Sequence, residues 1–386
     1  MATSGNFVQL HNHTHYSLLD GASKIPDLVK RAKELNMPAV GITDHGNMHG
    51  AYEMWSTAVK EGVKPIIGIE AYVTPETARQ DQTRVSWDTN WNPDIDPQHR
   101  RRNPNDVSGG GLITHLTMWA ETDEGLVNLM KASTDANLEG RVMRYPRMDK
   151  EILAKYSKGI IASSGCPSGI IQTRLLLGQF DEALRAAGEL QDIFGRDNFY
   201  IEFMDHGLKI EKQVTDGLLD IAKKLNAPLL ATNDSHYVRA EDAGSQDAML
   251  CINSGSTLDE PGRFKFDGTG YYLKSAEEMR ELFKDIPEAC DNTLEIAERC
   301  NVMFDDHEDG AFMPQFDCPE GWDETSLFLK KVEEGLERRY DGHPPIEVLK
   351  QADYECGVIC QMQFCGYFLV VADNINWAKS HGVMVG

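Results

Sequence analysis

Histidines alternate with other residues near the amino terminus, in the segment His11-Asn12-His13-Thr14-His15, and Asp20 follows shortly after. Side chains two positions apart on an extended segment point the same way, so His11 and His13 can bind one metal ion together. A His-x-His pair is a weak signal by itself, because packed and surface histidines are at least as common as metal ligands. The prediction of a metal site therefore depends on the other ligands that accompany this pair.

Metal-ligating side chains also stand at the ends of other runs that we expect to be strands. They are His45 in the segment Thr43-Asp44-His45-Gly46, then Glu70, His115 and Cys166, and finally Asp234 with His236. The carboxyl ends of the strands meet at one mouth in β/α barrels, where sites are built from several loops. With His11, His13 and Asp20 this gives nine donors at one place, a distribution that chance seldom produces. We expect these residues to form a metal centre.

The mixture of donors indicates which ions and which reaction to expect. Imidazole, carboxylate and one thiolate suit zinc or manganese, with iron and magnesium as alternatives, rather than calcium. Nine donors exceed what one ion takes up, so we expect two to three divalent ions. Such clusters bind phosphate oxygens, generate hydroxide from water near neutral pH and stabilise the leaving alkoxide. The chemistry that this predicts is phosphoester hydrolysis.

The elements that must position these residues alternate regularly along the chain. The first 240 residues alternate short β-branched runs with amphipathic stretches of helical period, which is typical of repeated βα units with a mostly parallel sheet. The seven runs expected to be strands are 7–10, 39–43, 65–73, 112–117, 159–163, 199–203 and 228–232. The predicted fold class is therefore α/β.

Composition narrows the class of protein further. The 386 residues carry 38 Lys plus Arg against 61 Asp plus Glu, a net charge of −23, so a module that holds nucleic acid through a basic face alone is excluded. The eight cysteines lie between Cys166 and Cys365 without the spacing of a disulfide framework, and we expect free thiols. No apolar run approaches the roughly 18 residues of a membrane helix, and no secretory signal is visible. We expect a cytoplasmic protein without a membrane partner.

Two departures from the alternation suggest the domain organisation. Residues 76–111 are rich in Asp, Asn, Pro and Gly and include Arg100, Arg101 and Arg102. These arginines either contact a phosphate backbone or belong to a solvated insertion loop. The alternation stops near residue 275, where Ser275 and Glu278 have the spacing of a capping box at the start of a helix. We expect a barrel over 1–275 and a smaller, helix-rich segment over 276–386.

Several polar residues near the predicted mouth have two interpretations. Asp44 either orients a ligating imidazole or simply forms a turn. We expect His15 to lie behind the ligands. Glu202, Asp205 and His206 follow the sixth strand and either line the mouth, where His206 would contact a phosphate or sugar, or belong to an ordinary exposed loop.

The sequence resembles a known family at these same residues. The segments LHNHTHYSLLDGA, GITDHGNM, KPIIGIEAYV, IIASSGCPSG and LLATNDSHY are similar to the PHP (polymerase and histidinol phosphatase) domain, and most of all to the PHP domain that opens bacterial DNA polymerase III alpha subunits. DNTLEIAERC and GYFLVVADNINWAKSHGVMVG are similar to the beginning of the palm in those subunits. The resemblance covers nearly the whole chain.

The resemblance implies a fold and a ligand set. The family fold is a distorted seven-stranded β/α barrel, and its complete members hold three metals with nine ligands. All nine match here, namely His11, His13, Asp20, His45, Glu70, His115, Cys166, Asp234 and His236. Asp20 and Asp234 are the two that we expect to contribute most to activating the nucleophile.

The resemblance also implies a function. An intact ligand set implies a metal-dependent 3′→5′ exonuclease that removes a mispaired nucleotide from the 3′ end of a DNA primer. The implied partners are the rest of the polymerase chain and, through it, the sliding clamp and other replisome subunits. The polymerase's own aspartates lie beyond residue 386 in this family, so nucleotide addition is not expected of this fragment. The alternatives are a non-catalytic, metal-stabilised PHP domain and a phosphatase acting on small phosphate monoesters.

Overall fold

The computed structural model describes residues 6–18, 20–92, 102–305 and 313–386. Its sheet contains eight strands in these residues: β1 (Ala39–Ile42), β2 (Lys64–Val73), β3 (Thr114–Ala120), β4 (Arg141–Val142), β5 (Tyr145–Met148), β6 (Ile160–Ser163), β7 (Phe199–Phe203) and β8 (Leu229–Ala231). The strand order is β4-β5-β2-β3-β6-β7-β8, and β1 pairs with β2. The predicted α/β class is confirmed.

The segment that carries the first histidines closes this sheet into a distorted barrel. Gln9 bridges to Val40 on one side, and Asn12 bridges to Ser235 on the other. The backbone N–H of Gly41 donates to the Gln9 carbonyl at 2.8 Å, and the N–H of His13 donates to the Ser235 carbonyl at 2.7 Å. The predicted first strand is therefore present only as isolated bridges. With it, the seven predicted runs surround the barrel, while β4 and β5 form an additional hairpin at its side.

The strand β3 departs from the expected mostly parallel arrangement. It runs antiparallel to both of its neighbours. His115 of β3 lies opposite Tyr72 of β2, and Ala120 of β3 lies opposite Ile160 of β6. The start of β3 consequently lies beside the end of β2. A β-branched run has the same sequence pattern in either direction, so the pattern does not reveal this reversal.

Between β2 and β3 the chain makes a long excursion that begins and ends at one rung, because Val73 pairs with Thr114. The predicted insertion lies within it and includes the short turn α3 (Ser108–Gly111). The fully buried Arg147 guanidinium holds the first residues of this excursion by donating to the carbonyls of Arg79 and Asp81 at 2.6 and 2.7 Å. Buried donors of this kind need such partners, so the base of the excursion is well fixed.

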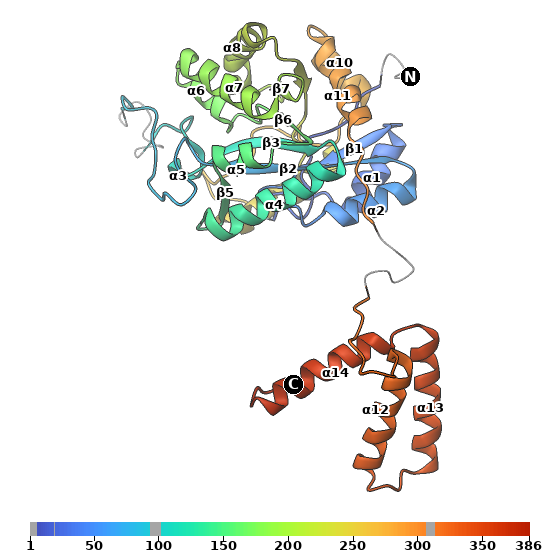
Figure 1. Cartoon of the computed structure of the whole chain (residues 1–386). Helices are drawn as coiled ribbons and strands as arrows, with labels where there is room; N and C mark the ends of the chain where they lie inside the picture. The colour runs from blue at the N-terminus through green and yellow to red at the C-terminus, as the bar shows by residue number, and fades with distance from the viewer. Residues whose placement is uncertain (1–5, 19, 93–101, 306–312) are drawn as a thin grey trace. The chain divides into compact units, whose positions relative to one another are not determined.

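Helices cover the outside of the sheet (Figure 1). Each turns an apolar face inward; in α1, for example, Leu28 and Val29 are fully buried. These outer helices are α1 (Ile25–Glu34), α2 (Ala51–Glu61), α4 (Asp123–Glu139), α5 (Lys150–Lys155), α6 (Ile170–Leu176), α7 (Phe180–Phe194), α8 (Lys209–Leu225) and α9 (Ala243–Ser254).

Two further helices belong to the barrel unit, although we predicted a boundary near 275. They are α10 (Ala276–Leu282), which begins with the predicted capping box of Ser275 and Glu278, and α11 (Pro287–Arg299). Ile296 of α11 is fully buried in a cluster with Val8 and Trp119 of the barrel interior. The compact unit therefore extends to Phe304, and the second unit begins at Asp305. The boundary lies later than predicted because α11 completes the core of the barrel.

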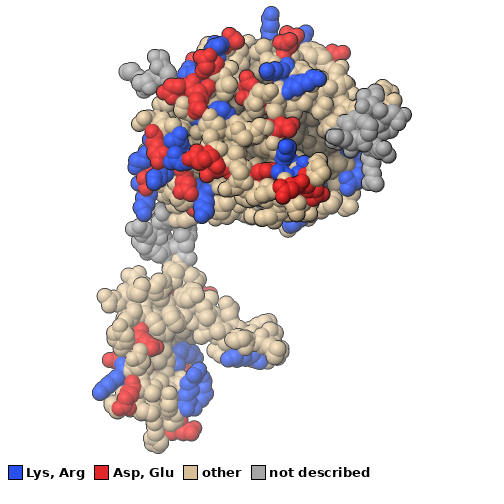
Figure 2. Space-filling view, turned by 180° about the vertical axis from the view of Figure 1, so that it is seen from behind, with Lys and Arg blue, Asp and Glu red and all other residues tan. Residues whose placement is uncertain are grey.

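The second unit consists, in its described residues, of α12 (Glu324–Arg339), α13 (Ile346–Gln361) and α14 (Cys365–Ser380). Its small core is built around Leu327, Phe328 and Leu369. No single helix among the described residues has both the length and the hydropathy of a membrane span; α13 and α14 reach them only when taken as one pair, which is bent by 113°. On the face in Figure 2, acidic and basic side chains are interspersed over the barrel unit.

Candidate metal centre

The barrel brings the nine predicted ligands to one mouth. His11, His13 and Asp20 come from the closing segment and the turn after it, and His45 follows β1. Glu70 lies in β2 and His115 at the start of the reversed strand β3, which thus reaches the same mouth as the ends of its neighbours. The remaining three follow β6 and β8; they are Cys166, Asp234 and His236.

The carboxylate of Glu70 lies at the middle of this cluster and is almost fully buried. Its Oε2 is 2.7 Å from His45 Nδ1 and 3.2 Å from His13 Nε2, and its Oε1 is 2.9 Å from His115 Nδ1. Burial alone would raise its pKa, but His115 and His45 outweigh this and hold the pKa well below its usual range. Glu70 is therefore a charged group that several imidazoles share.

Asp234 forms a second shared carboxylate. Its Oδ1 lies 3.0 Å from His13 Nε2 and 3.3 Å from His11 Nε2. Its backbone has a φ of 43°, in the left-handed region that side chains other than glycine rarely adopt. Such conformations persist where the surrounding structure imposes them, often at functional sites. Here the imposing contacts are the backbone bonds from Ser235 to the His11 carbonyl and from His236 to the Tyr271 carbonyl.

Asp20 and Cys166 complete the set at its edges. Asp20 Oδ2 lies 3.3 Å from His45 Nε2, and the Cys166 sulfur lies 3.5 Å from His115 Nδ1. Burial raises the pKa of the Cys166 thiol well above its usual range, and the Glu70 and Asp234 charges add to this effect. The thiol therefore keeps its proton unless a cation displaces it.

Residues behind the ligands determine which ring nitrogens face the centre. The Ser17 hydroxyl donates to Asp44 Oδ1 at 2.7 Å, so it accepts a hydrogen bond from His13 Nδ1 at 2.8 Å. Glu202 Oε1 accepts from His11 Nδ1 at 2.7 Å in the same way. Nε2 is consequently the ring nitrogen that faces Glu70 and Asp234, and once it has lost its proton it presents the lone pair that a metal ligand requires.

The cluster fits metal ions on the chemistry of its atoms. Six buried ligand atoms have no hydrogen-bond partner among the described residues: His11 Nε2, His13 Nε2, His45 Nδ1, Asp20 Oδ1, Glu70 Oε2 and Asp234 Oδ1. Buried polar atoms without partners are costly, and a cation at their centre would satisfy them. Three overlapping groups of His, Glu and Asp atoms lie close enough together to hold an ion. His, Glu and Asp residues that could bind metal are therefore assembled in one place.

Protons balance the charge of this cluster when metal is absent. Burial lowers the pKa of His11, but Asp234 and Glu202 outweigh it and raise the pKa well above its usual value. Asp20 and Glu70 raise the pKa of His45 in the same manner against the effect of burial. His11 and His45 therefore hold protons that an incoming cation would replace.

Two other predicted residues, His206 and Arg102, have their polar groups engaged by residues outside the ligand set. Both ring nitrogens of the buried His206 are engaged, Nδ1 with Glu211 at 2.6 Å and Nε2 with the Asn233 carbonyl at 2.9 Å. Arg102 donates to the Val85 carbonyl at 2.6 Å within its own loop. Arg100 and Arg101 lie outside the described residues. The structure thus presents neither His206 nor Arg102 as a free group at the mouth.

The remaining polar residues predicted near the mouth lie behind the ligands or in turns. Asp44 reaches His13 through Ser17, and Glu202 lies behind His11 rather than at the mouth. Asp205 accepts a bond from the Gly207 N–H within a turn, and the His15 ring packs on Tyr16. Ser17 was not predicted, because no local pattern distinguishes it from other serines in turns.

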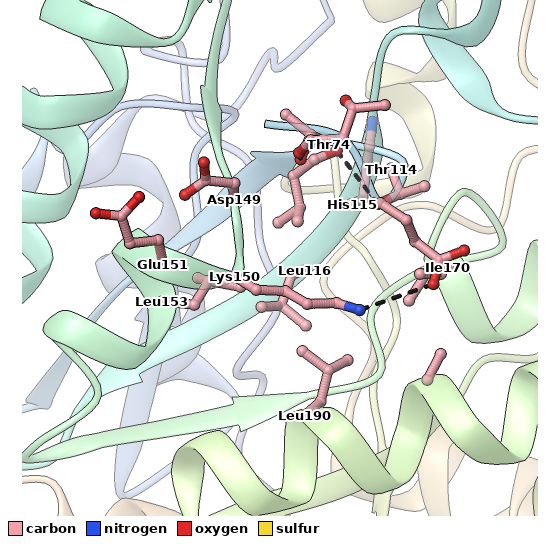
Figure 3. Close-up of a pocket in the computed structure, with 14 residues that line it drawn as sticks. Thr74, Thr114, His115, Leu116, Asp149, Lys150, Glu151, Leu153, Ile170 and Leu190 are labelled. Carbon is pink, nitrogen blue, oxygen red and sulfur yellow. Dashed lines mark hydrogen bonds and ion pairs between the residues drawn. The ribbon is translucent and has the colours of Figure 1, made fainter. Parts of the chain in front are cut away.

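A separate cavity of about 260 Å³ lies between β3 and the helices α5 and α7. Figure 3 shows the Lys150 side chain extending between Leu116 and Leu190. The Lys150 ammonium pairs with Glu189 and lies 3.7 Å from Glu76. His115 borders this cavity, but its Nδ1 points to Glu70 instead. The cavity is therefore distinct from the ligand cluster.

Comparison with known proteins relates this site to others. Residues 9–206 match the family model described as the PHP domain, and residues 326–386 match that of the bacterial DNA polymerase III alpha NTPase domain. The chain is 50% identical over 386 residues to DNA polymerase III subunit alpha of Mycobacterium tuberculosis strain H37Rv, covering 100% of this chain and 32% of the relative. It is 39% identical over 384 residues to the same subunit of Treponema pallidum, covering 99% and 30%. The chain thus spans about a third of the length of these curated relatives.

Among solved structures, the chain resembles one titled a putative metal-dependent phosphoesterase, from Bifidobacterium adolescentis. The sequence identity is 15% and the TM-score 0.35, over 72% of this chain and 96% of that one.

Proposed function

Because this chain belongs to the PHP domain family, we propose that its ligand cluster binds divalent ions and hydrolyses phosphodiester bonds in DNA from the 3′ end. The observation that carries the proposal is the set of six buried ligand atoms that converge at the barrel mouth without a hydrogen-bond partner among the described residues. The likeness to DNA polymerase III alpha subunits supports DNA as the substrate. The product of each cycle is a nucleoside monophosphate.

The ligands divide according to how far they reach toward solvent. His11, His13 and Glu70 are essentially buried and would hold the ions from the side of the barrel interior. The side chains of Asp20 and Asp234 are 21% and 15% exposed, so these two carboxylates lie where a substrate can approach. His45, His115, Cys166 and His236 would complete two to three sites. Zinc or manganese suits this donor set.

When bound, the ions would supply a hydroxide near neutral pH and stabilise the leaving oxygen. The protein's own residues then prepare the site. Ser17 and Glu202 keep His13 and His11 in the tautomer that presents Nε2. Asp234, held in its left-handed conformation, orients one carboxylate oxygen between two imidazoles. Asp20, whose Oδ2 lies 3.3 Å from His45 Nε2, would accept a proton from water.

The test is release of the 3′-terminal nucleotide from a labelled single-stranded or mismatched primer, with manganese or zinc supplied. This chain is compared with its Asp234→Asn form and with Ser56→Ala, a serine that bonds only to the Glu53 carbonyl among the described residues. We expect release by the parent and by Ser56→Ala and none by Asp234→Asn. Equal release by all three would overturn the proposal.

Two other functions make different predictions. A metal-stabilised PHP domain without catalysis would bind ions but release no nucleotide, and its melting temperature would collapse in Asp234→Asn. A phosphatase of small monoesters would hydrolyse a nucleoside monophosphate faster than a primer. The match of residues 326–386 to a polymerase model favours the DNA substrate over this second alternative. The rest of the polymerase, the sliding clamp and other replisome subunits are the partners that the proposal implies.

A further inference from the structure

A row of aromatic rings crosses the metal centre and continues beyond it on both sides. The imidazoles of three ligands form its middle, with centroid separations of 4.1 Å between His13 and His45 and 4.3 Å between His13 and His236. At one end the ring of Tyr72 lies parallel to His45 at 5.8 Å, followed by Tyr145 at 5.1 Å. At the other end the row runs from His236 to Phe266 at 4.7 Å and on to Phe264 at 6.2 Å.

The two phenylalanines differ in how they are packed. Phe266 is half-buried and makes edge contacts with His236 and Tyr271, so packing accounts for it. Phe264 is 58% exposed, and Phe266 is the ring beside it. Phe264, one ring removed from the ligand His236, therefore leaves an aromatic surface open on which a base can stack.

The segment that presents Phe264 is anchored at the mouth. Arg263 forms an ion pair with Asp247 of α9 at 2.5 Å. The same helix contacts the ligand turn, where Gln246 donates to the Asp20 carbonyl at 3.2 Å. Phe264 is therefore held in place relative to the metal ligands rather than projecting from a free loop.

Cations accompany the aromatic rings at both ends of the row. The exposed Lys265 stands between Phe264 and Phe266 in the sequence. Arg144 lies beside Tyr145, with its guanidinium 5.4 Å from the ring centroid. Aromatic faces interleaved with cations are what single-stranded nucleic acid binds, because bases stack and phosphates pair with the positive charges. Because the whole chain has a net charge of −23, such local cations are needed to attract a DNA strand.

We propose that Phe264 is a stacking platform for the unpaired bases of a single DNA strand whose 3′ end enters the metal centre. This proposal rests on the nuclease function proposed above, and it names the feature that selects a single strand. The internal bases of a duplex have both faces covered by their neighbours and cannot stack on Phe264. A frayed or mispaired end can do so, and Lys265 would lie near its phosphates.

The test measures binding separately from hydrolysis. The probe is a fluorescein-labelled oligodeoxyadenylate of about 12 nucleotides with phosphorothioate linkages at its 3′ end, which resist cleavage. A second probe has the same backbone but abasic residues at that end. Fluorescence anisotropy with manganese present gives the Kd of each probe for the chain and its variants.

We expect Phe264→Ala to raise the Kd for the base-containing probe about tenfold and to leave the Kd for the abasic probe unchanged. Phe264→Trp should restore the affinity for the first probe. Val59→Ala, an exposed apolar truncation near the end of α2, should change neither. An unchanged Kd in Phe264→Ala would overturn the proposal, and so would equal weakening for both probes.

A hydrolysis assay on an unmodified oligonucleotide keeps the two proposals apart. If no DNA is cleaved while Phe264→Ala raises the Kd for the base-containing probe alone, the nuclease function fails and the platform stands. If the chain cleaves DNA and the Kd does not respond to Phe264→Ala, the platform fails and the nuclease function stands.

Discussion

The Ser17 hydroxyl lies 2.8 Å from His13 Nδ1 and is itself held by Asp44, at 2.7 Å from Oδ1. Removing this hydroxyl in Ser17→Ala leaves the imidazole free to rotate and to change tautomer. We expect metal affinity to fall about tenfold to a hundredfold, with little change in melting temperature. Competition with a chromogenic chelator measures the affinity. Ser56→Ala, which removes a hydroxyl bonded to the Glu53 carbonyl and to no ligand among the described residues, is the matched control. Equal affinities in the two variants would refute the role of Ser17.

Metal binding should release protons from the cluster. The carboxylates raise the pKa of His11 and His45 despite burial, and burial raises that of Cys166, so the metal-free site holds protons at neutral pH. A cation must displace them, and its affinity should therefore fall as the pH is lowered. Calorimetric titration in two buffers of different ionisation enthalpy measures the released protons. Identical heats in both buffers would show that no proton leaves.

Lys274 predicts an unusual dependence of stability on alkaline pH. Its ammonium is buried, donates to Asn233 Oδ1 at 2.6 Å, and has its pKa lowered by burial from 10.5 to about 8. Between these two values the unfolded chain binds more protons than the folded one, so the free energy of unfolding should rise with pH, by at most about 3 kcal/mol. Urea unfolding at several pH values measures this slope. It should disappear in Lys274→Met, and a slope unchanged by that substitution would contradict the prediction.

The late domain boundary makes a prediction about truncation. A chain that ends after Phe304 keeps α11 and should unfold within a few degrees of the full chain. A chain that ends at residue 275 loses the fully buried Ile296 and Cys300, and the Thr293 hydroxyl that accepts from the Val8 N–H at 3.1 Å. We expect it to lose at least about 5 kcal/mol of stability. Thermal unfolding of the two fragments measures the difference in stability. Equal melting temperatures would place the boundary at 275.

The assembly of the candidate site could be largely predicted from the sequence. Ligand types at the ends of successive strands, such as His45 after β1 and Asp234 after β8, point to one mouth because parallel strands bring their ends together. The same logic placed His115 there for the wrong reason, since β3 is reversed and its start, not its end, lies at the mouth. Periodicity encodes burial but not strand direction.

Other features depended on contacts that sequence patterns do not contain. Ser17 and Glu202 orient histidines that lie near them only after folding. α11 has an ordinary amphipathic pattern, which states that one face is buried but not what covers it. The boundary therefore came out too early. His206 has the residue type of a substrate ligand, and its burial against Glu211 emerges only in three dimensions.

The excursion between β2 and β3 leaves and rejoins the barrel at the single pair Val73 and Thr114. The roughly forty residues between them take the place of a hairpin turn, because the register of β2 and β3 does not depend on the number of residues that connect them. Chain length added or removed there changes the entropy of closure only slowly, by roughly 0.6 kcal/mol for each doubling. A protein engineer could accordingly splice a foreign module into this excursion, beyond the part that Arg147 secures, without moving His115 from its place.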